Sequence, residues 1–495
     1  MKKFNFLVLT ALTFSLTSCQ PDPNPEADIS VSQVSDSTTL EAKINSVNTA
    51  YEDLKYEVYD LNDELVTTIE EVNQTNSIEL PRHGQFTVKL LSKDGKDLYD
   101  EERVTLNVAE INLAYIRATA PVSLFTYLAL TEYQGVYSYI DLARGNSYKW
   151  DYLPENFKLI PGIRDTYQKD EFGLFQEELP VVREFLKDIV TELPNIKVNL
   201  FICDAEPTEL VLDMYKLMDE ENFTIKFLTD GTLTNNALND NLLNMDQYAS
   251  YKENIEKVLA DKDSYDKFGA STIENNFVLA SMKENVDFYV YDKKTIADNC
   301  EDTQLKNLYN TFITELSYLD MYETFDADEK LKREFEYLFG TRWEEDGKEN
   351  SIAEVFSASE KPNLVILGTS PSGEDVYPYS FETMMEYVVD KYGTNYDIFY
   401  KGHPAYPSDS SRVKYFEENS IYELPSSTPA EILLTFYPDV YTGGYLSTTY
   451  LSAKENQILM VFSTEEDLRN NSAYTGSLDL FENTEFIIDV LNNSN

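Results

Sequence analysis

Short apolar runs alternate with helix-like segments from about residue 109 onward, and this alternation constrains the fold more than any other feature. The clearest runs are INLAYI (111–116), KVNLFIC (197–203), TIKFL (224–228), NLVIL (363–367) and NQILMVFST (456–464). Parallel strands need a crossover connection, usually a helix, so this order predicts a parallel α/β architecture. Open sheets of this kind bind ligands at the carboxyl ends of their strands, where we therefore expect the functional residues.

The length of 495 residues predicts two or three domains, because a single hydrophobic core stops growing well below that size. Residues 39–108 hold short alternating runs separated by turns, which predicts a small β-sandwich of the immunoglobulin-like type. Two Rossmann-like α/β domains are expected to follow. The predicted segments are a lipoprotein signal peptide (1–19), a flexible tether rich in Pro, Asp and Ser (20–38), the sandwich (39–108), a first Rossmann-like domain (109–355) and a second one (356–495).

The N-terminus has the pattern of a targeting segment. Lys2 and Lys3 precede an apolar stretch (4–17), and Leu16-Thr17-Ser18-Cys19 matches the lipobox of bacterial lipoproteins. In those proteins the cysteine becomes a lipid-bearing N-terminus, so we expect lipid on Cys19 and a protein anchored to the membrane in the bacterial cell envelope. The alternative is an ordinary signal peptide with a cysteine there by chance.

The formal net charge of −48 excludes nucleic acid as an expected partner, because its phosphates would be repelled. An anionic substrate would have to be held by local cations and helix N-termini instead of long-range attraction. Cys203 and Cys300 lie in no CxxC pair, so no metal cluster is indicated. The sequence leaves open whether these two cysteines form a disulfide or remain buried thiols.

A lysine and a histidine follow another apolar run, 398–400, in the sequence Lys401-Gly402-His403-Pro404. Glycine permits unusual backbone angles and proline stops a strand, so Lys401 and His403 are predicted to lie on a loop at the strand's carboxyl end. His403 is the only histidine after residue 109.

Two further motifs follow within fifty residues. Pro425-Ser-Ser-Thr-Pro-Ala-Glu431 predicts a helix start, with Thr428 as the N-cap and Pro429 at the first helical position. Gly443-Gly444-Tyr-Leu-Ser447-Thr448-Thr449 predicts a strand end followed by hydroxyl groups that suit a phosphate.

In this order and at this spacing, the three motifs resemble the nucleotide-binding half of the bacterial sialyltransferases of glycosyltransferase family 80. That family carries a Lys-Gly-His-Pro loop, a Pro-x-x-x-x-x-Glu helix start and a Gly-Gly-x-x-Ser-Ser/Thr turn. The resemblance covers about residues 109–490 and implies the GT-B arrangement, in which two Rossmann-like domains face one another across a cleft. It implies an acceptor-side domain in 109–355 and a nucleotide-binding domain in 356–495.

The resemblance implies a sialyltransferase that moves sialic acid from CMP-sialic acid to a galactose-containing glycan, with inversion and without a metal or cofactor. Asp230 corresponds to the general base, although its Asp-Gly pair is also a common hairpin turn. His403 corresponds to the residue that assists the departure of CMP. The implied nucleotide- and donor-binding residues are Lys401, Glu431, Ser447, Thr448, Gly368 and Thr369.

The acceptor side departs from the family pattern. Glu206 replaces a histidine near the acceptor, Arg117 replaces an aspartate, and Thr229 replaces an acid before the Asp-Gly pair. Pro371-Ser372-Gly373 stands where the family has an acceptor-contacting tryptophan. Glu206 and Ser370 are the expected acceptor contacts, and these departures leave the acceptor and the linkage open.

Several alternatives remain at this stage. Glu431 could cap its own helix together with Thr428, and Ser447 and Thr448 could be simple helix caps. Two Asp-x-Asp sequences (261–263 and 326–328) resemble a metal signature, but such matches are expected by chance among 88 acidic residues, so no catalytic metal is predicted. The alternative functions are transfer of another CMP-keto sugar or nucleotide sugar, and a non-catalytic surface glycan-binding lipoprotein.

Overall fold

The computed structural model describes residues 24–118, 120–142, 149–166, 178–206, 208–261, 272–316, 318–345, 348–403, 408–425, 428–454 and 456–494. The predicted signal peptide with Cys19 lies outside these residues, as does Pro404. The chain divides into two compact units, one ending at Asn107 and one beginning at Val108. Within the described ranges, no helix has the length and apolar character needed to cross a membrane.

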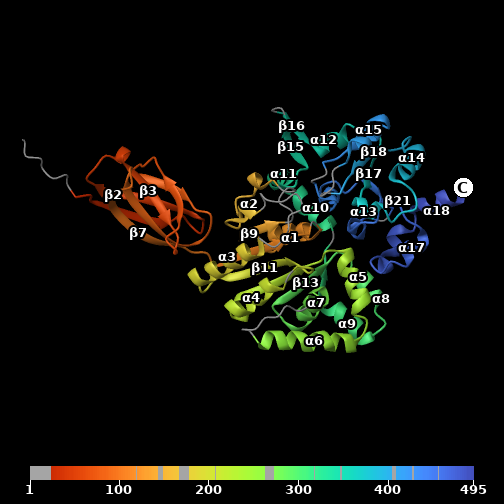
Figure 1. Ribbon diagram of the computed structural model, residues 1–495, viewed down its shortest axis with the longest axis horizontal. Coiled ribbons are helices and arrows are strands. Elements are labelled where there is room, and N and C mark those ends of the chain that lie inside the picture. Colours follow the sequence, from red (N-terminus) through yellow and green to blue (C-terminus); the bar gives the residue numbers. More distant parts are fainter. Residues whose placement is uncertain are drawn as a thin grey trace, which may run out of the picture. The chain divides into compact units, whose positions relative to one another are not determined.

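The first unit is a β-sandwich of two antiparallel sheets (Figure 1). One sheet has the order β1-β2-β5 (Ala27–Gln33, Thr39–Val47, Thr75–Glu79), and the other β4-β3-β6-β7 (Leu65–Ile69, Leu54–Tyr59, Gly84–Ser92, Leu98–Leu106). Alternate side chains of both sheets, such as Leu40 on β2 and Val88 on β6, enter one shared core. The small N-terminal β domain is thus confirmed, and its immunoglobulin-like type stays a prediction.

Strand β1 corrects the predicted tether of residues 20–38. Residues 27–33 pair with β2, and Ile29 is buried in the sandwich core. The backbone amides of Ile29 and Val31 donate hydrogen bonds to the carboxylates of Asp100 and Glu102. Ile29 and Val31 alternate with polar residues, and this strand-like pattern predicts the local structure better than the polar composition on which the tether prediction rested.

The second unit contains two sheets whose strands pair in parallel, as the sequence predicts. The first sheet has the order β10-β9-β8-β11-β12-β13-β14 (Phe157–Leu159, Tyr137–Leu142, Glu110–Ile116, Lys197–Cys203, Phe223–Leu228, Val286–Val290, Ile313–Glu315). The second has the order β19-β18-β17-β20-β21-β22 (Tyr422–Glu423, Asp397–Lys401, Asn363–Leu367, Tyr441–Gly444, Ile458–Val461, Glu485–Phe486).

Helices connect and cover these strands (Figure 1). Those of the first half are α1 (Ala120–Thr131), α2 (Ile163–Thr166), α3 (Glu178–Glu192), α4 (Glu209–Leu217), α5 (Thr232–Asn241), α6 (Met245–Ala260), α7 (Thr272–Met282), α8 (Lys293–Asn299), α9 (Thr303–Phe312), α10 (Tyr318–Asp326) and α11 (Glu329–Leu338). After the hairpin β15–β16 (Arg342–Glu345, Lys348–Ser351) come α12 (Ile352–Ser357), α13 (Pro371–Glu374), α14 (Phe381–Tyr392), α15 (Ser410–Glu418), α16 (Ala430–Phe436), α17 (Glu465–Arg469) and α18 (Ile487–Ser494). Short 3-10 helices are η1 (Tyr51–Asp53), η2 (Trp150–Tyr152), η3 (Glu220–Asn222), η4 (Thr448–Ser452) and η5 (Thr475–Phe481).

Three apolar cores hold the second unit together. One packs the first sheet against α3, α4, α6, α7 and α9, and another packs the second sheet against α14, α15 and α18. The third core takes side chains from both sheets and from α1, α11 and α16. Because this core is shared, residues from 108 onward form one compact unit, and the predicted boundary at 355 falls inside α12.

Each parallel sheet has a point where its strand order reverses. The first sheet starts with β8 and grows outward through β9 and β10 on one side and β11 to β14 on the other. The second starts with β17 and grows through β18 and β19 on one side and β20 to β22 on the other. Open α/β sheets bind ligands at such a point, at the carboxyl ends of the strands, which here are β8 and β11 in the first sheet and β17 and β20 in the second.

Gly476 allows η5 to pack against α8 between the two halves. An added Cβ there would lie 2.2 Å from Thr295 Cα and 2.5 Å from Thr295 N, so the backbone would have to shift. We expect Gly476→Ala to lower the free energy of unfolding by about 2–3 kcal/mol in urea denaturation. Gly135→Ala is the control, because Gly135 has φ +82° but nothing within 4 Å of the added atom, and it should cost about 1 kcal/mol. Equal costs for the two variants would contradict the packing role.

Candidate active site

Three loops of the second half emerge at one edge of its sheet. Leu367, the last residue of β17, pairs with Lys401 at the end of β18 on one side and with Gly444 at the end of β20 on the other. The residues that follow these three positions therefore start side by side. The structure in this way brings together the predicted donor-binding residues Gly368, Thr369, Ser447 and Thr448. The predicted catalytic residue His403 and the predicted acceptor residue Ser370 follow the same strand ends.

Lys401 does not lie on the loop where the sequence analysis placed it. It is the last residue of β18, and the residue is 2% exposed. Burial lowers the pKa of Lys401 to about 7, and the negative charges of Glu431 and Glu423 oppose that shift. Its Nζ donates a hydrogen bond to the Gly402 carbonyl, so Lys401 holds the backbone that leads to the partly exposed His403.

Glu431 is buried in the first turn of α16, close enough to Lys401 for their charges to interact. Burial raises the pKa of Glu431, and its own backbone amide, the charge of Lys401 and the hydroxyl of Thr449 oppose the rise. The predicted cap is wrong by one residue, because Pro429 occupies the N-cap position. Thr428 instead donates its hydroxyl to the Gly340 carbonyl, 3.1 Å away, so it forms no capping box with Glu431.

Gly368 is required by a close approach to Tyr400. An added Cβ would lie 2.3 Å from the Tyr400 hydroxyl oxygen. Two positions later, the Ser370 hydroxyl caps α13 by accepting a hydrogen bond from the Gly373 amide at 3.1 Å. At the end of α13, Arg412 binds Glu374 with both terminal nitrogens (2.8 and 2.7 Å), which fixes this loop against α15.

Ser447 and Thr448 use their hydroxyls differently. The Ser447 hydroxyl caps η4 by accepting from the Thr449 amide at 3.3 Å, as the capping alternative predicts. The Thr448 hydroxyl faces the first half of the unit and lies 3.0 Å from the Thr232 hydroxyl. It also accepts from the Thr232 amide at 3.3 Å and approaches the Asp230 carbonyl at 3.5 Å.

The first half presents its own set of loops at the carboxyl ends of neighbouring strands. Tyr115 of β8 pairs with Ile202 of β11, and Cys203 pairs with Leu228 of β12, so Arg117, the turn 204–206 and the turn 229–231 start close together. Arg117 lies 3.8 Å from Glu206, and both side chains are largely buried. Two of the residues that depart from the family pattern, Arg117 and Glu206, therefore form one ion pair.

Asp204, Glu206 and Asp230 form a group of interacting carboxyls. Burial raises the pKa of Asp204 to about 7; the Thr234 hydroxyl opposes this rise, and the charge of Asp230 adds to it. Burial likewise raises the pKa of Glu206 to about 7, opposed by Arg117 and supported by Asp230. Asp230 is partly exposed, so it is the member of the group that opens toward solvent.

The two halves meet at the turn that contains Asp230. Gly231 has φ +76°, and an added Cβ would lie 2.0 Å from Thr448 Cγ2. The predicted base and the predicted phosphate loop are therefore neighbours, joined by the contacts of Thr448 described above. The same half-to-half contact continues where Asn235 and Asn239 of α5 donate to the carbonyls of Ala473 and Ser472.

Sequence reasoning missed Asp204, which is fully buried directly after β11. Its position at a strand end, two residues before Glu206, was the available signal.

Cys203 and Cys300 are both buried and form no disulfide. Among the residues that the structure describes, no cluster of three or more His, Cys, Asp or Glu is arranged to hold a metal ion.

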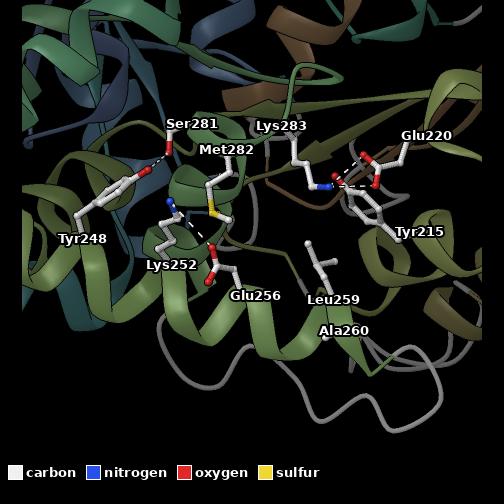
Figure 2. A pocket seen from close by; sticks show the side chains of 10 residues that line it. All are labelled: Tyr215, Glu220, Tyr248, Lys252, Glu256, Leu259, Ala260, Ser281, Met282 and Lys283. Atoms are coloured by element: carbon white, nitrogen blue, oxygen red, sulfur yellow. Dashed lines mark hydrogen bonds and ion pairs between the residues drawn. The ribbon is translucent and has the colours of Figure 1, made fainter.

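A groove of about 670 Å³ lies elsewhere on the first half, and no predicted site residue lines it (Figure 2). It is formed by α4, η3, α6 and the end of α7, next to the amino ends of β12 and β13. Its lysines are already engaged by glutamates: Lys283 pairs with Glu220 at 3.0 Å and Lys252 with Glu256 at 4.0 Å. Since ligands of open α/β sheets bind at the carboxyl edge, the candidate active site remains at the meeting of the two halves.

Two Rossmann-like halves that meet at their carboxyl edges define the GT-B fold. Solved bacterial sialyltransferases share it: an α/β-galactoside α-2,3-sialyltransferase from Photobacterium phosphoreum is 18% identical, with TM-score 0.54 over 78% of this chain and 100% of its own. A 2,6-sialyltransferase from a Vibrionaceae Photobacterium, solved with CMP and lactose, is 15% identical, with TM-score 0.52 over 94% of both chains. The GT-B domain of a Photobacterium damselae sialyltransferase is 12% identical, with TM-score 0.51 over 77% of this chain and 98% of its own.

No family model and no curated protein sequence matches the chain. At the identities given above, the similarity to the sialyltransferases establishes the fold. It therefore confirms, for the fold, the resemblance that the motifs indicate.

The buried charge of Lys401 should make stability depend on pH. Its pKa is lower in the folded than in the unfolded state, so the native protein binds fewer protons between about pH 7 and 10.5, and stability rises with pH there. Lys401→Met removes this dependence, so its stability relative to wild type should fall by on the order of 3 kcal/mol between pH 7 and 9.5. Chemical denaturation at each pH measures the difference, with the exposed Lys414→Met as control. A difference that does not change with pH would show that folding does not lower the pKa of Lys401.

Proposed function

We propose that the protein is a sialyltransferase that moves sialic acid from CMP-sialic acid to a galactose-containing glycan, with inversion and without a metal or cofactor. The observation that carries this proposal is the contact of Thr448 with the turn of Asp230, which joins the proposed base to the proposed phosphate loop. The GT-B fold shared with bacterial sialyltransferases, one of them solved with CMP and lactose, supports it.

In the proposed reaction, the Asp230 carboxylate accepts the proton of the acceptor hydroxyl while that oxygen attacks the anomeric carbon. The bond from this carbon to the phosphate oxygen breaks, and its electron pair leaves with CMP. Protonated His403 donates to the departing phosphate and so stabilises its charge. Attack on the face opposite the leaving group inverts the anomeric centre.

Each donor-binding residue is proposed to contact a different part of the nucleotide. Glu431, next to the Thr449 hydroxyl, is proposed to accept hydrogen bonds from the ribose hydroxyls. Ser447 and Thr448 are proposed to donate to the phosphate. Thr448 can turn its proton from the long 3.5 Å contact with the Asp230 carbonyl toward a phosphate oxygen and still accept from the Thr232 amide. Lys401 is proposed to act indirectly, because its Nζ holds the Gly402 carbonyl next to His403.

The remaining proposed contacts concern the sugar and the acceptor. Gly368 and Thr369 are proposed to lie beside the nucleotide and the donor sugar. Ser370 can donate its hydroxyl to the acceptor while it caps α13. Glu206, paired with Arg117, is proposed to accept hydrogen bonds from an acceptor sugar. We also propose that lipid on Cys19 anchors the protein in the bacterial cell envelope.

Removal of the base should abolish transfer without loss of donor binding. Wild-type protein incubated with CMP-sialic acid and lactose should give sialylated lactose and CMP, with the linkage read by NMR. We expect Asp230→Asn to lower kcat by about a thousandfold, in the range of a lost general base. Asp240→Asn, an exposed carboxylate on α5, is the matched control and should keep full activity. Wild-type turnover in Asp230→Asn would remove Asp230 as the base.

Nucleotide identity can be tested by thermal unfolding with CMP, UDP and GDP. A ligand at a hundred times its Kd stabilises the folded protein by about 2.7 kcal/mol, so CMP alone should raise Tm clearly. Glu431→Gln should weaken the CMP shift because the ribose contact is lost, whereas Glu423→Gln, at the edge strand β19, should leave it intact. Stabilisation by UDP or GDP in place of CMP would favour another nucleotide-sugar transferase, and no shift with any of them would contradict donor binding.

A further inference from the structure

The buried carboxylate of Asp204 connects the two strand-end turns of the first half. It is 0% exposed, and its Oδ1 accepts a hydrogen bond from the Asp230 amide at 3.1 Å. Its Oδ2 accepts from the Thr234 hydroxyl at 2.6 Å. Asp204 thus spans from the end of β11 to both the turn after β12 and the first turn of α5.

The Asp230 amide is held from two sides. Besides the Asp204 carboxylate, it reaches the Thr234 hydroxyl oxygen at 3.0 Å. That hydroxyl donates its own proton to Asp204, so the three groups close a small ring of hydrogen bonds. The ring fixes the backbone at the residue whose side chain is the proposed base.

Asp204 is itself held in place. Its carbonyl accepts from the Asn276 side chain at 2.8 Å, and its amide donates to the Leu228 carbonyl at 3.0 Å. The thiol of Cys203 approaches its Oδ1 at 3.7 Å. An acceptor anchored on this many sides keeps its position when substrate enters, and such support decides how well a catalytic group is aimed.

We propose that Asp204 is a positioning residue for Asp230, holding the backbone of the base through the Asp230 amide and the Thr234 hydroxyl. This inference rests on the proposed function. It assigns Asp204 no contact with substrate; its effect on the reaction passes through the placement of the Asp230 carboxylate.

The contact itself predicts the effects of two substitutions. Asp204→Ala removes the acceptor, and we expect kcat to fall by about a hundredfold, as for the loss of a buried hydrogen-bond acceptor, while the donor KM stays within about threefold. Asp204→Asn keeps an acceptor oxygen for the Asp230 amide, and its kcat should stay within about tenfold of wild type. A residue needed only for folding would change expression and KM together and would show no rescue by Asn.

Two further variants complete the test. Thr234→Val removes the hydroxyl and keeps the shape, so it should lower kcat by about tenfold, and it serves if Asp204→Ala fails to fold. Asp213→Asn is the matched control: Asp213 is a largely buried carboxylate on α4, paired with Arg183, and its loss should leave kcat unchanged.

Amide hydrogen exchange of residues 229–234 tests the contact without any assay of transfer. Exchange of the Asp230 amide should accelerate at least tenfold in Asp204→Ala and less in Thr234→Val, but not in Asp213→Asn. Unchanged exchange, or wild-type kcat in Asp204→Ala, would overturn the positioning role. Absence of transfer by the wild-type protein would instead overturn the proposed function, and the exchange measurement would still decide whether Asp204 holds the turn.

Discussion

The approach of Thr448 to the Asp230–Gly231 turn is the contact on which the arrangement of the site depends. Each sheet places its own loops at its own carboxyl edge, and this contact joins the turn that contains Asp230 in one half to the hydroxyl loop of Thr448 in the other. The approach leaves no room for a side chain at Gly231, where a Cβ would lie 2.0 Å from Thr448 Cγ2. The Asp-Gly pair therefore serves the packing of two halves, which a hairpin turn would not require.

Burial, more than the net charge of −48, determines the electrostatics of the site. Exposed charges are screened by water and salt over about 10 Å, whereas the groups beneath the two edges are shielded from both. Burial lowers the pKa of Lys401 and raises the pKa of Asp204 and Glu206. A strongly acidic protein can in this way keep buried carboxyls at the site partly neutral. These three shifts reduce the charge at the carboxyl edges of both halves.

The sequence predicts most of the architecture, because apolar runs of strand length and the polar residues after them determine both the sheets and their functional edges. Prediction from the sequence fails where a tertiary contact determines the position or the hydrogen-bond partner of a side chain. Lys401 moves from a loop to a buried strand end through a shift of one residue, and Thr428 gives its hydroxyl to Gly340 instead of to its own helix. Asp204 was not predicted as a site residue because its hydrogen-bond partners lie 26 and 30 residues further along the chain. No local pattern records such a contact.

A crystal structure of the protein with CMP tests the central claim most directly. We expect the phosphate beside His403 and Ser447, the ribose beside Glu431, and the Asp230 carboxylate facing the nucleotide from the other half. A nucleotide bound in the groove beside α6, or an Asp230 carboxylate directed away from the CMP phosphate, would contradict it.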